Sequence, residues 1–233
     1  MTLSVKKTEV LRQVKTGTSP AVSNITVGGV PLQYVDKFCY LGSIISSDGS
    51  LDGEISHSIA KASAAFDQLR NRLWNEDGVR LRTKIDVYRA VVLSILLYSC
   101  ETWTIYRRHI YSLDKFHLRC LRQITGIKWQ DKIPNTVVLQ QCEMTGIETL
   151  IMQAQLRWSG HLVRMPDTRF PKAIFYSQLS SGSRRCGHPV KRYKDALKRN
   201  LQLCNIDPTT WDRDNCSGPF AVEMFLCDGS IQF

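Results

Sequence analysis

The sequence has 233 residues, of which 43% are hydrophobic and 22% charged, and its formal net charge is +10. This length allows one large domain or two small ones, and the composition excludes wholesale disorder, collagen and low complexity. The most apolar stretch, residues 90–98, is about half the length that a bilayer requires, and the first ten residues lack the apolar core of a secretory signal. We therefore expect an intracellular protein, nuclear or cytoplasmic, without a membrane partner.

The charge is unevenly distributed along the chain. Residues 1–60 hold five basic and five acidic side chains, whereas residues 61–214 hold 26 basic and 14 acidic ones. A basic excess confined to one section is typical of a protein with a polyanionic partner, usually nucleic acid. An ordinary basic soluble protein remains the alternative at this point.

The first fifty residues carry strand and turn signals. Residues 23–35 predict a β-hairpin around Gly28 and Gly29, because two glycines supply the positive φ angles of a tight turn. Residues 38–45 are rich in aromatic and β-branched side chains and predict a third strand, which a turn over residues 46–49 closes.

After residue 50 the apolar period changes from two to between three and four, which predicts helices. Five are expected: residues 51–73, 81–100, 108–125, a short one with Asn135 as its N-cap, and 148–163. The residues expected on the inward faces of the first three are Leu51, Ile55, Ile59, Ala62, Phe66, Leu69, Leu73, Ile85, Tyr88, Val92, Ile95, Leu96, Leu113, Phe116, Cys120, Leu121 and Ile124.

The rest of the chain is expected to be less regular. Residues 166–188 contain prolines, serines and glycines and predict a linker, after which Pro189 opens a basic helix that extends to about Cys204. The predicted class is α+β, mostly α: a short N-terminal β-hairpin element followed by a helical bundle. The expected segments are a β element (1–50), a helical domain (51–165), the linker (166–188), a basic helical region (189–213) and an irregular tail (214–233).

No arrangement of residues indicates an active site. The motifs of common hydrolases and nucleotide-binding enzymes are absent, and His161 near a helix end is more typical of a structural histidine than of a base. The eight cysteines form no CxxC pair and are expected to be reduced, buried thiols. His117 with Cys120, and Cys186 with His188, have spacings that zinc accepts, but nothing completes a four-ligand set. We therefore expect no catalytic residue from these patterns, and no metal or cofactor in this chain.

Binding chemistry is more visible. Seven cations fall within sixteen residues and face only one acid, Asp195; they are Arg184, Arg185, Lys191, Arg192, Lys194, Lys198 and Arg199. On a helix, the lysines at 191, 194 and 198 would share one face and the arginines at 192 and 199 another, and such a helix can neutralise phosphates. A solvated basic helix without a ligand explains the same pattern equally well. Trp129 and Trp158 each follow a cation; we expect them to anchor helices, with base stacking as the alternative.

Several segments together resemble one family. In chain order they are Lys6-Lys7-Thr8-Glu9-Val10, Phe38-Cys39-Tyr40-Leu41-Gly42-Ser43-Ile44-Ile45, Leu97-Tyr98-Ser99-Cys100-Glu101-Thr102-Trp103, Phe116-His117-Leu118-Arg119-Cys120-Leu121-Arg122-Gln123-Ile124-Thr125-Gly126-Ile127 and Arg157-Trp158-Ser159-Gly160-His161-Leu162-Val163-Arg164-Met165. Trp129, Asp131, Asn135 and the stretch from Gly187 to Asp195 agree as well. The sequence thus resembles, over about residues 5–212, the reverse transcriptases of non-LTR (LINE, RTE/BovB-like) retrotransposons.

The resemblance implies specific roles. Lys7 matches a lysine thought to assist the leaving pyrophosphate, and it is the one residue with an implied accessory catalytic role. Phe38, Tyr40, Leu41 and Gly42 match the primer-grip hairpin, and the helices from about Glu54 onward would form the thumb that holds an RNA or DNA template–primer.

The resemblance also implies what the chain lacks. In the family, Mg²⁺ is held by aspartates at an aromatic-x-Asp-Asp turn just upstream of the matched region, and this sequence contains no Asp-Asp pair. The matched region does not include the family's endonuclease domain. The resemblance also implies that an upstream palm domain of the parent polymerase is a partner of this chain. The prediction is a fragment of an RNA-directed DNA polymerase, inactive alone, that retains at most template–primer binding. The alternative is a non-functional relic or a protein-interaction module.

Overall fold

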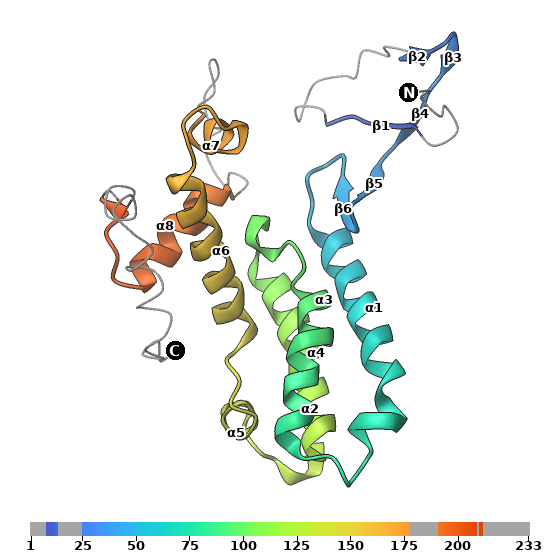
Figure 1. Cartoon of the computed structure of the whole chain (residues 1–233), viewed down its shortest axis with the longest axis vertical. Coiled ribbons are helices and arrows are strands. Elements are labelled where there is room, and N and C mark those ends of the chain that lie inside the picture. The colour runs from blue at the N-terminus through green and yellow to red at the C-terminus, as the bar shows by residue number, and fades with distance from the viewer. Residues whose placement is uncertain (1–7, 14–24, 178–190, 209, 212–233) are drawn as a thin grey trace. The chain divides into compact units, whose positions relative to one another are not determined.

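The computed structural model describes residues 8–13, 25–177, 191–208 and 210–211, and the statements below refer to these residues. The chain divides into two compact units, Met1–Tyr98 and Ser99–Phe233, which are treated separately. Short strands occur in the first unit and helices in both, so the predicted α+β class with mostly α content is confirmed (Figure 1). Along the described ranges, no helix combines the length and apolar character needed to cross a membrane.

The N-terminal strands form small pairs. Strand β1 (Glu9–Leu11) runs parallel to β4 (Gln33–Val35), and β2 (Thr26–Val27) pairs antiparallel with β3 (Val30–Pro31). Gly28 and Gly29 connect β2 and β3 with φ angles of 59° and 81°. The predicted glycine-turn hairpin is therefore confirmed in its described part, while residues 23 and 24 lie outside the described residues.

The single strand predicted over residues 38–45 is wrong. It is a second hairpin, in which β5 (Lys37–Tyr40) pairs antiparallel with β6 (Ser43–Ser46) around Leu41 and Gly42. These two turn residues have φ angles of 48° and 91°. Strand-forming side chains lie on both arms without interruption, so the β-propensity of the segment hides a turn that depends on one glycine.

The helices of the first unit follow the predicted periodicity, and the second helical run ends earlier than predicted. Helix α1 (Asp52–Gln68) continues into a π-helical turn over Arg70–Trp74. A second helical run comprises α2 (Leu81–Val87), a π-helical segment Tyr88–Leu93 and α3 (Ser94–Leu96). It ends before residue 100 because the chain leaves helical geometry at Leu97 and Ser99 takes a φ of 57°.

An aromatic cluster fills the core of the first unit. The rings of Phe66 and Trp74 stack with centroids 4.9 Å apart, Tyr88 meets Phe66 edge-on, and the indole N–H of Trp74 donates to the Phe66 carbonyl at 2.7 Å. Five residues that were expected to face inward are only half buried: Leu51, Ile59, Leu69, Leu73 and Ile95. The other residues of these helices that were expected to face inward are buried, so the buried stripe is narrower than the apolar sequence pattern indicates.

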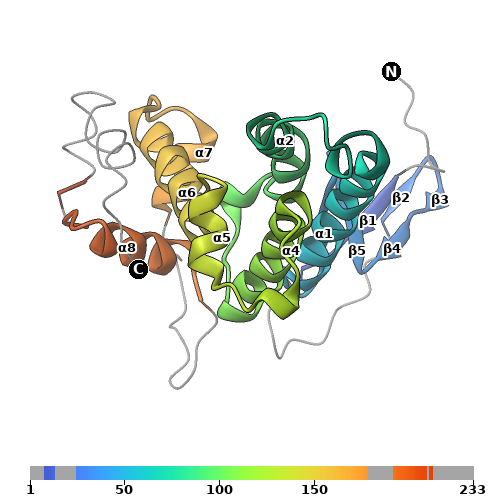
Figure 2. The same cartoon turned by 90° about the horizontal axis from the view of Figure 1, so that it is seen from below.

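Helix α6 is the centre of the second unit. This unit contains a 3₁₀ turn (Cys100–Thr102), α4 (Arg107–Thr125), a 3₁₀ turn (Trp129–Asp131), α5 (Asn135–Gln141), α6 (Ile147–Arg164), α7 (Phe170–Tyr176) and α8 (Tyr193–Leu203). Helix α6 packs against α4, α7 and α8 and lies between α4 and α8 in both views (Figures 1 and 2). Helices predicted at 108–125 and 148–163 are confirmed within one residue at each end.

Three local expectations for the second unit are corrected. Pro134 is the N-cap of α5 and Asn135 is its first helical residue. The expected linker contains α7, whose Pro171 occupies the first turn, where a proline favours a helix rather than breaking it. Helix α8 begins at Tyr193, later than predicted; Pro189 and the linker residues 178–188 lie outside the described residues, as does the tail 214–233.

The cysteines partly meet expectation. Cys100, Cys120, Cys142 and Cys204 are buried free thiols, whereas Cys39 on β5 is exposed. Burial raises the pKa of Cys100 to about 12, helped by the adjacent Glu101 carboxylate, so this thiol stays protonated. Cys186, Cys216 and Cys227 lie outside the described residues.

Candidate nucleic-acid interface

The β5–β6 hairpin brings the four residues predicted for a primer grip together. The Ile44 N–H on β6 donates to the buried carboxylate of Glu54 on α1, and the Lys61 ammonium of α1 donates to the Gly42 carbonyl at 3.1 Å. Two contacts with one helix thus fix the hairpin. Its tip projects into solvent, with Tyr40 56% and Leu41 75% exposed.

The tip of the hairpin offers rings and apolar surface, while the exposed Lys37 lies at the far end of β5. Phe38 and Tyr40 lie on the same face of β5, with ring centroids 6.5 Å apart. Lys61, at the turn, is the cation in contact with the hairpin tip. Such a surface suits contacts with sugars and base edges more than contacts with phosphates.

Some cations in and just before helix α8 contact the rest of the fold, and others face solvent. The Lys191 ammonium, just before the helix, donates to the Ile105 carbonyl at 2.8 Å, and its backbone N–H donates to the Tyr106 hydroxyl at 3.1 Å. Burial and the neighbouring Arg199 charge lower the pKa of Lys191. The Lys194 ammonium lies over the Phe175 ring, 5.5 Å from its centroid. These two cations therefore hold the helix in place.

The remaining predicted cations of this region differ in exposure. Arg192 and Lys198 are exposed, and Arg199 is half exposed with its guanidinium 3.9 Å from the Glu148 carboxylate. Glu148 also pairs with Arg107 at 2.7 Å. Arg192, Lys198 and Arg199 are thus the cations of α8 that reach solvent.

Three of the predicted site residues cannot be placed. Arg184, Arg185 and Lys7 lie outside the described residues, so their roles remain predictions.

Helix α8 is docked onto the core of its unit. Leu197 and Leu201 are buried against Met152, Leu156 and Val163 of α6. A polar chain crosses the same contact: the Asn200 amide donates to the Gln155 side-chain oxygen, and the Gln155 amide donates to the Trp103 carbonyl, both at 2.8 Å. The solvent-facing cations of α8 are therefore presented by a fixed surface.

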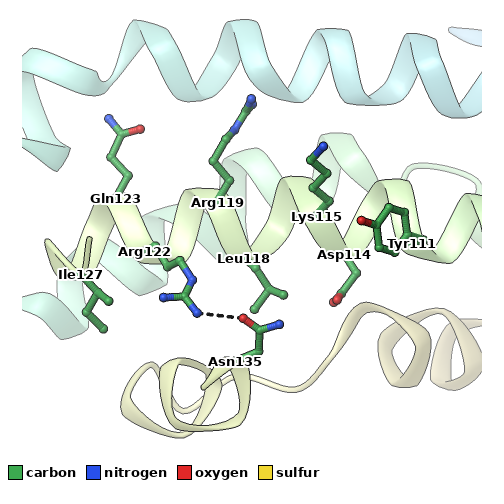
Figure 3. Close-up of a pocket in the computed structure, with 9 residues that line it drawn as sticks. All are labelled: Tyr111, Asp114, Lys115, Leu118, Arg119, Arg122, Gln123, Ile127 and Asn135. Carbon is green, nitrogen blue, oxygen red and sulfur yellow. Dashed lines mark hydrogen bonds between the residues drawn. The ribbon is translucent and has the colours of Figure 1, made fainter. Parts of the chain in front are cut away.

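A second basic surface, along α4, was not found by sequence reasoning. A groove of about 530 Å³ follows this helix (Figure 3), and its lining residues are Tyr111, Asp114, Lys115, Leu118, Arg119, Arg122, Gln123, Ile127 and Asn135. Sequence reasoning used the segment only for its apolar stripe. The available signal was the spacing of Lys115, Arg119 and Arg122, which puts three cations within about two helical turns.

The aromatic and histidine residues singled out from the sequence have mixed outcomes. Trp129 is 80% exposed, so the expected anchoring role is wrong for this residue; Trp158 is half buried, and its ring lies 5.7 Å from that of the exposed His161. Burial lowers the pKa of His117 to about 4, and a hydrogen bond with the Thr145 backbone, which raises the pKa, offsets only part of this effect. Among the described residues, no three His, Cys, Asp or Glu side chains converge as metal ligands.

One comparison with known proteins shows a sequence similarity. A Caenorhabditis elegans protein described as transposon-derived is 22% identical over 209 residues, which cover 88% of this chain and 74% of the worm protein. The chain is similar to a transposon-derived protein. The sequence matches no protein-family model, and no solved structure matches it.

Proposed function

We propose that this chain is the C-terminal part of a non-LTR retrotransposon reverse transcriptase and binds template–primer nucleic acid. The observation that carries the proposal is the similarity to a transposon-derived protein along 88% of the chain. The ordered motifs of the sequence and the basic excess of residues 61–214 support the finer assignment.

In this proposal the β5–β6 hairpin positions the 3′ end of a primer. Tyr40 and Leu41 supply an exposed apolar edge for a sugar or base, and Gly42 allows the tight turn that presents them. Glu54 and Lys61 hold the hairpin against α1, so the primer end would meet a fixed surface.

The solvent-facing cations of α8 supply the affinity. Arg192, Lys198 and Arg199 would contact phosphates and release counterions, a contribution that does not depend on base sequence. Because α8 is fixed by Leu197 and Leu201, little ordering accompanies binding.

The chain alone is proposed to be inactive as a polymerase. Phosphoryl transfer by two metal ions needs carboxylates that hold both ions, and the sequence has no adjacent aspartate pair. The described residues do not fit a Mg²⁺ pair either, since no three ligating side chains converge. We therefore assign Mg²⁺ chemistry to an intact enzyme with its palm domain, and Lys7 keeps only an accessory role.

Fluorescence anisotropy with a labelled primer–template at increasing salt tests the binding. We expect affinity to fall linearly with salt on logarithmic axes, and the double variant Arg192→Ala/Arg199→Ala to bind about tenfold more weakly with a shallower slope. The matched control is Arg82→Ala/Arg89→Ala, which removes two surface arginines near Asp86 and changes the net charge equally.

Two outcomes would contradict the proposal. Affinity that does not change with salt would exclude phosphate contacts, and a folded chain that binds no nucleic acid would favour a protein-interaction module. Primer extension by the purified chain with Mg²⁺ and nucleotides would contradict the inactive assignment.

A further inference from the structure

The groove along α4 is built from two rows of side chains. Lys115, Arg119 and Gln123 project on one side of the helix, while Leu118 and Arg122 turn toward Asn135 of α5 (Figure 3). Residues four apart on a helix rise by about 6 Å along its axis. The two exposed cations, Lys115 and Arg119, are thus separated by a distance comparable to that between neighbouring phosphates of one nucleic-acid strand.

The charges in this groove differ in how they are used. The Arg122 guanidinium donates to the Ile133 carbonyl at 2.8 Å and to the Asn135 side-chain oxygen at 2.9 Å, so it fixes the wall that α5 forms. Arg119 lies over the buried Phe116 ring, 5.2 Å from its centroid, and remains exposed. Among the described residues, neither Lys115 nor Arg119 forms an ion pair. The lining holds three cations and one carboxylate, Asp114.

Exposed aromatic rings lie at or near both ends of the groove. Tyr111, in the lining at one end, is 71% exposed. Trp129, 80% exposed, follows the lining residue Ile127 by two positions, within about 7 Å of backbone. It sits in a 3₁₀ turn where the Asp131 carboxylate accepts the Lys128 N–H at 2.7 Å. An indole this exposed, next to Lys128, can serve as a stacking surface for a base.

We propose that the α4 groove binds a single nucleic-acid strand, with Lys115 and Arg119 on successive phosphates and Trp129 stacked on an unpaired base. This inference rests on the proposed nucleic-acid-binding function and names a second site with a different substrate form. The preference for a single strand over a duplex follows from Trp129, because stacking on the face of its indole needs a base that is free of its neighbour.

An acidic peptide is the competing occupant, because it too would satisfy Lys115 and Arg119. The aromatic rings favour nucleic acid, since every base offers a π-face whereas an acidic side chain offers none. The two occupants differ in an observable way: only the nucleic acid gains from the indole ring by stacking.

Anisotropy with a labelled single-stranded oligonucleotide, run in parallel with a duplex of equal length, tests the site. We expect Lys115→Ala/Arg119→Ala to reduce the salt slope for the single strand by about 1.4, and Trp129→Ala to weaken binding at least about fivefold without changing the slope. Trp129→Phe keeps a ring and should retain most of the affinity. Duplex binding, assigned to α8, should change little in all three variants.

Controls separate failure of the site from failure of the proposed function. Arg82→Ala/Arg89→Ala matches the charge change of the double variant, and circular dichroism verifies folding. If the wild type binds both probes and the α4 variants keep its affinity for the single strand, this inference is overturned and the proposed function stands. Binding of neither probe by the wild type would overturn both. If the α4 variants lost more affinity for a glutamate-rich peptide than for the oligonucleotide, the groove would be assigned to an acidic peptide instead.

Discussion

Helices α4 and α8 of the second unit are both basic, and they use their cations differently. In α8 and the residue before it, Lys191 bonds to the Ile105 carbonyl and Lys194 lies over the Phe175 ring, so much of the charge serves the fold. In α4 the cations are more widely spaced, yet Lys115 and Arg119 remain exposed along a groove.

This difference shows that the density of cations in a sequence is a poor measure of the charge available to a ligand. Lys191 and Lys194 are half buried and give their donors and stems to packing, whereas Arg119 remains exposed although it also lies over a ring. A sparser pair on one exposed helix face keeps both charges for a partner. The comparison depends on the burial of each helix, which the following experiments test.

The largest effect is expected from the buried face of α8. Leu201 is fully buried against α6, whereas Leu203, two residues later, is 42% exposed. We expect Leu201→Ala to lower the free energy of unfolding by about 2–5 kcal/mol, and Leu203→Ala by less than about 1 kcal/mol. Urea titration measures both. Equal, small losses would mean that α8 is a solvated arm, and the contrast with α4 would disappear.

An intermediate effect is expected from the buried face of α4, which carries His117, whereas the buried residues of α8 are Ala196, Leu197 and Leu201. The pKa of His117 is about 4 in the folded chain against 6.5 for an ordinary histidine, because burial disfavours its charged form. Between these values the unfolded chain binds more protons. Stability should therefore be unaffected by this group above about pH 6.5 and fall as the pH drops toward 4, by on the order of 2–3 kcal/mol.

The His117→Gln variant isolates this contribution. Urea titrations from pH 7 to pH 4 should show a shallower decline for His117→Gln than for the wild type, and the exposed His161→Gln should keep the wild-type profile. Identical profiles for all three proteins would show that His117 is not buried in the neutral form.

The smallest effect separates the two kinds of cation within the α8 region. We expect Lys191→Met to lower the free energy of unfolding by about 1–2 kcal/mol, because the Ile105 carbonyl loses a charged donor. Arg192→Ala should change stability by less than about 0.5 kcal/mol and reduce the salt slope of duplex binding by about 0.9. Urea titration and anisotropy on both variants make the comparison. If both variants weakened binding equally at unchanged stability, the division between structural and solvent-facing cations would be wrong.

The long, regular helices were the most predictable part of the fold. Residues 107–125 and 147–164 carry an apolar stripe through about five turns, so the helical period dominates any local exception. The hairpin at Gly28 and Gly29 was predictable for a similar reason, since the turn chemistry is local. By contrast, the turn at Leu41–Gly42 lies inside an uninterrupted β signal, and α7 is short and starts beside a proline.

The candidate site was predictable only in its residue types. The cluster of cations around α8 is evident from the sequence, but the Ile105 carbonyl that engages Lys191 lies 86 residues earlier. Trp129 was expected to be buried because large apolar rings usually are, and its exposure follows from the packing of the surrounding chain. The α4 groove requires Asn135 of α5 as its second wall, a pairing that helical spacing along α4 does not indicate.

By itself, the sequence determined the helix-rich class and the uneven charge, and it carries the similarity to a transposon-derived protein, because each depends on residue order and local periodicity. Only the tertiary structure decided which cations face solvent, which ring is exposed, and that the chain divides after Tyr98. The physical reason is that propensity acts over one or two turns of chain, whereas burial and pairing depend on contacts between residues far apart in the sequence.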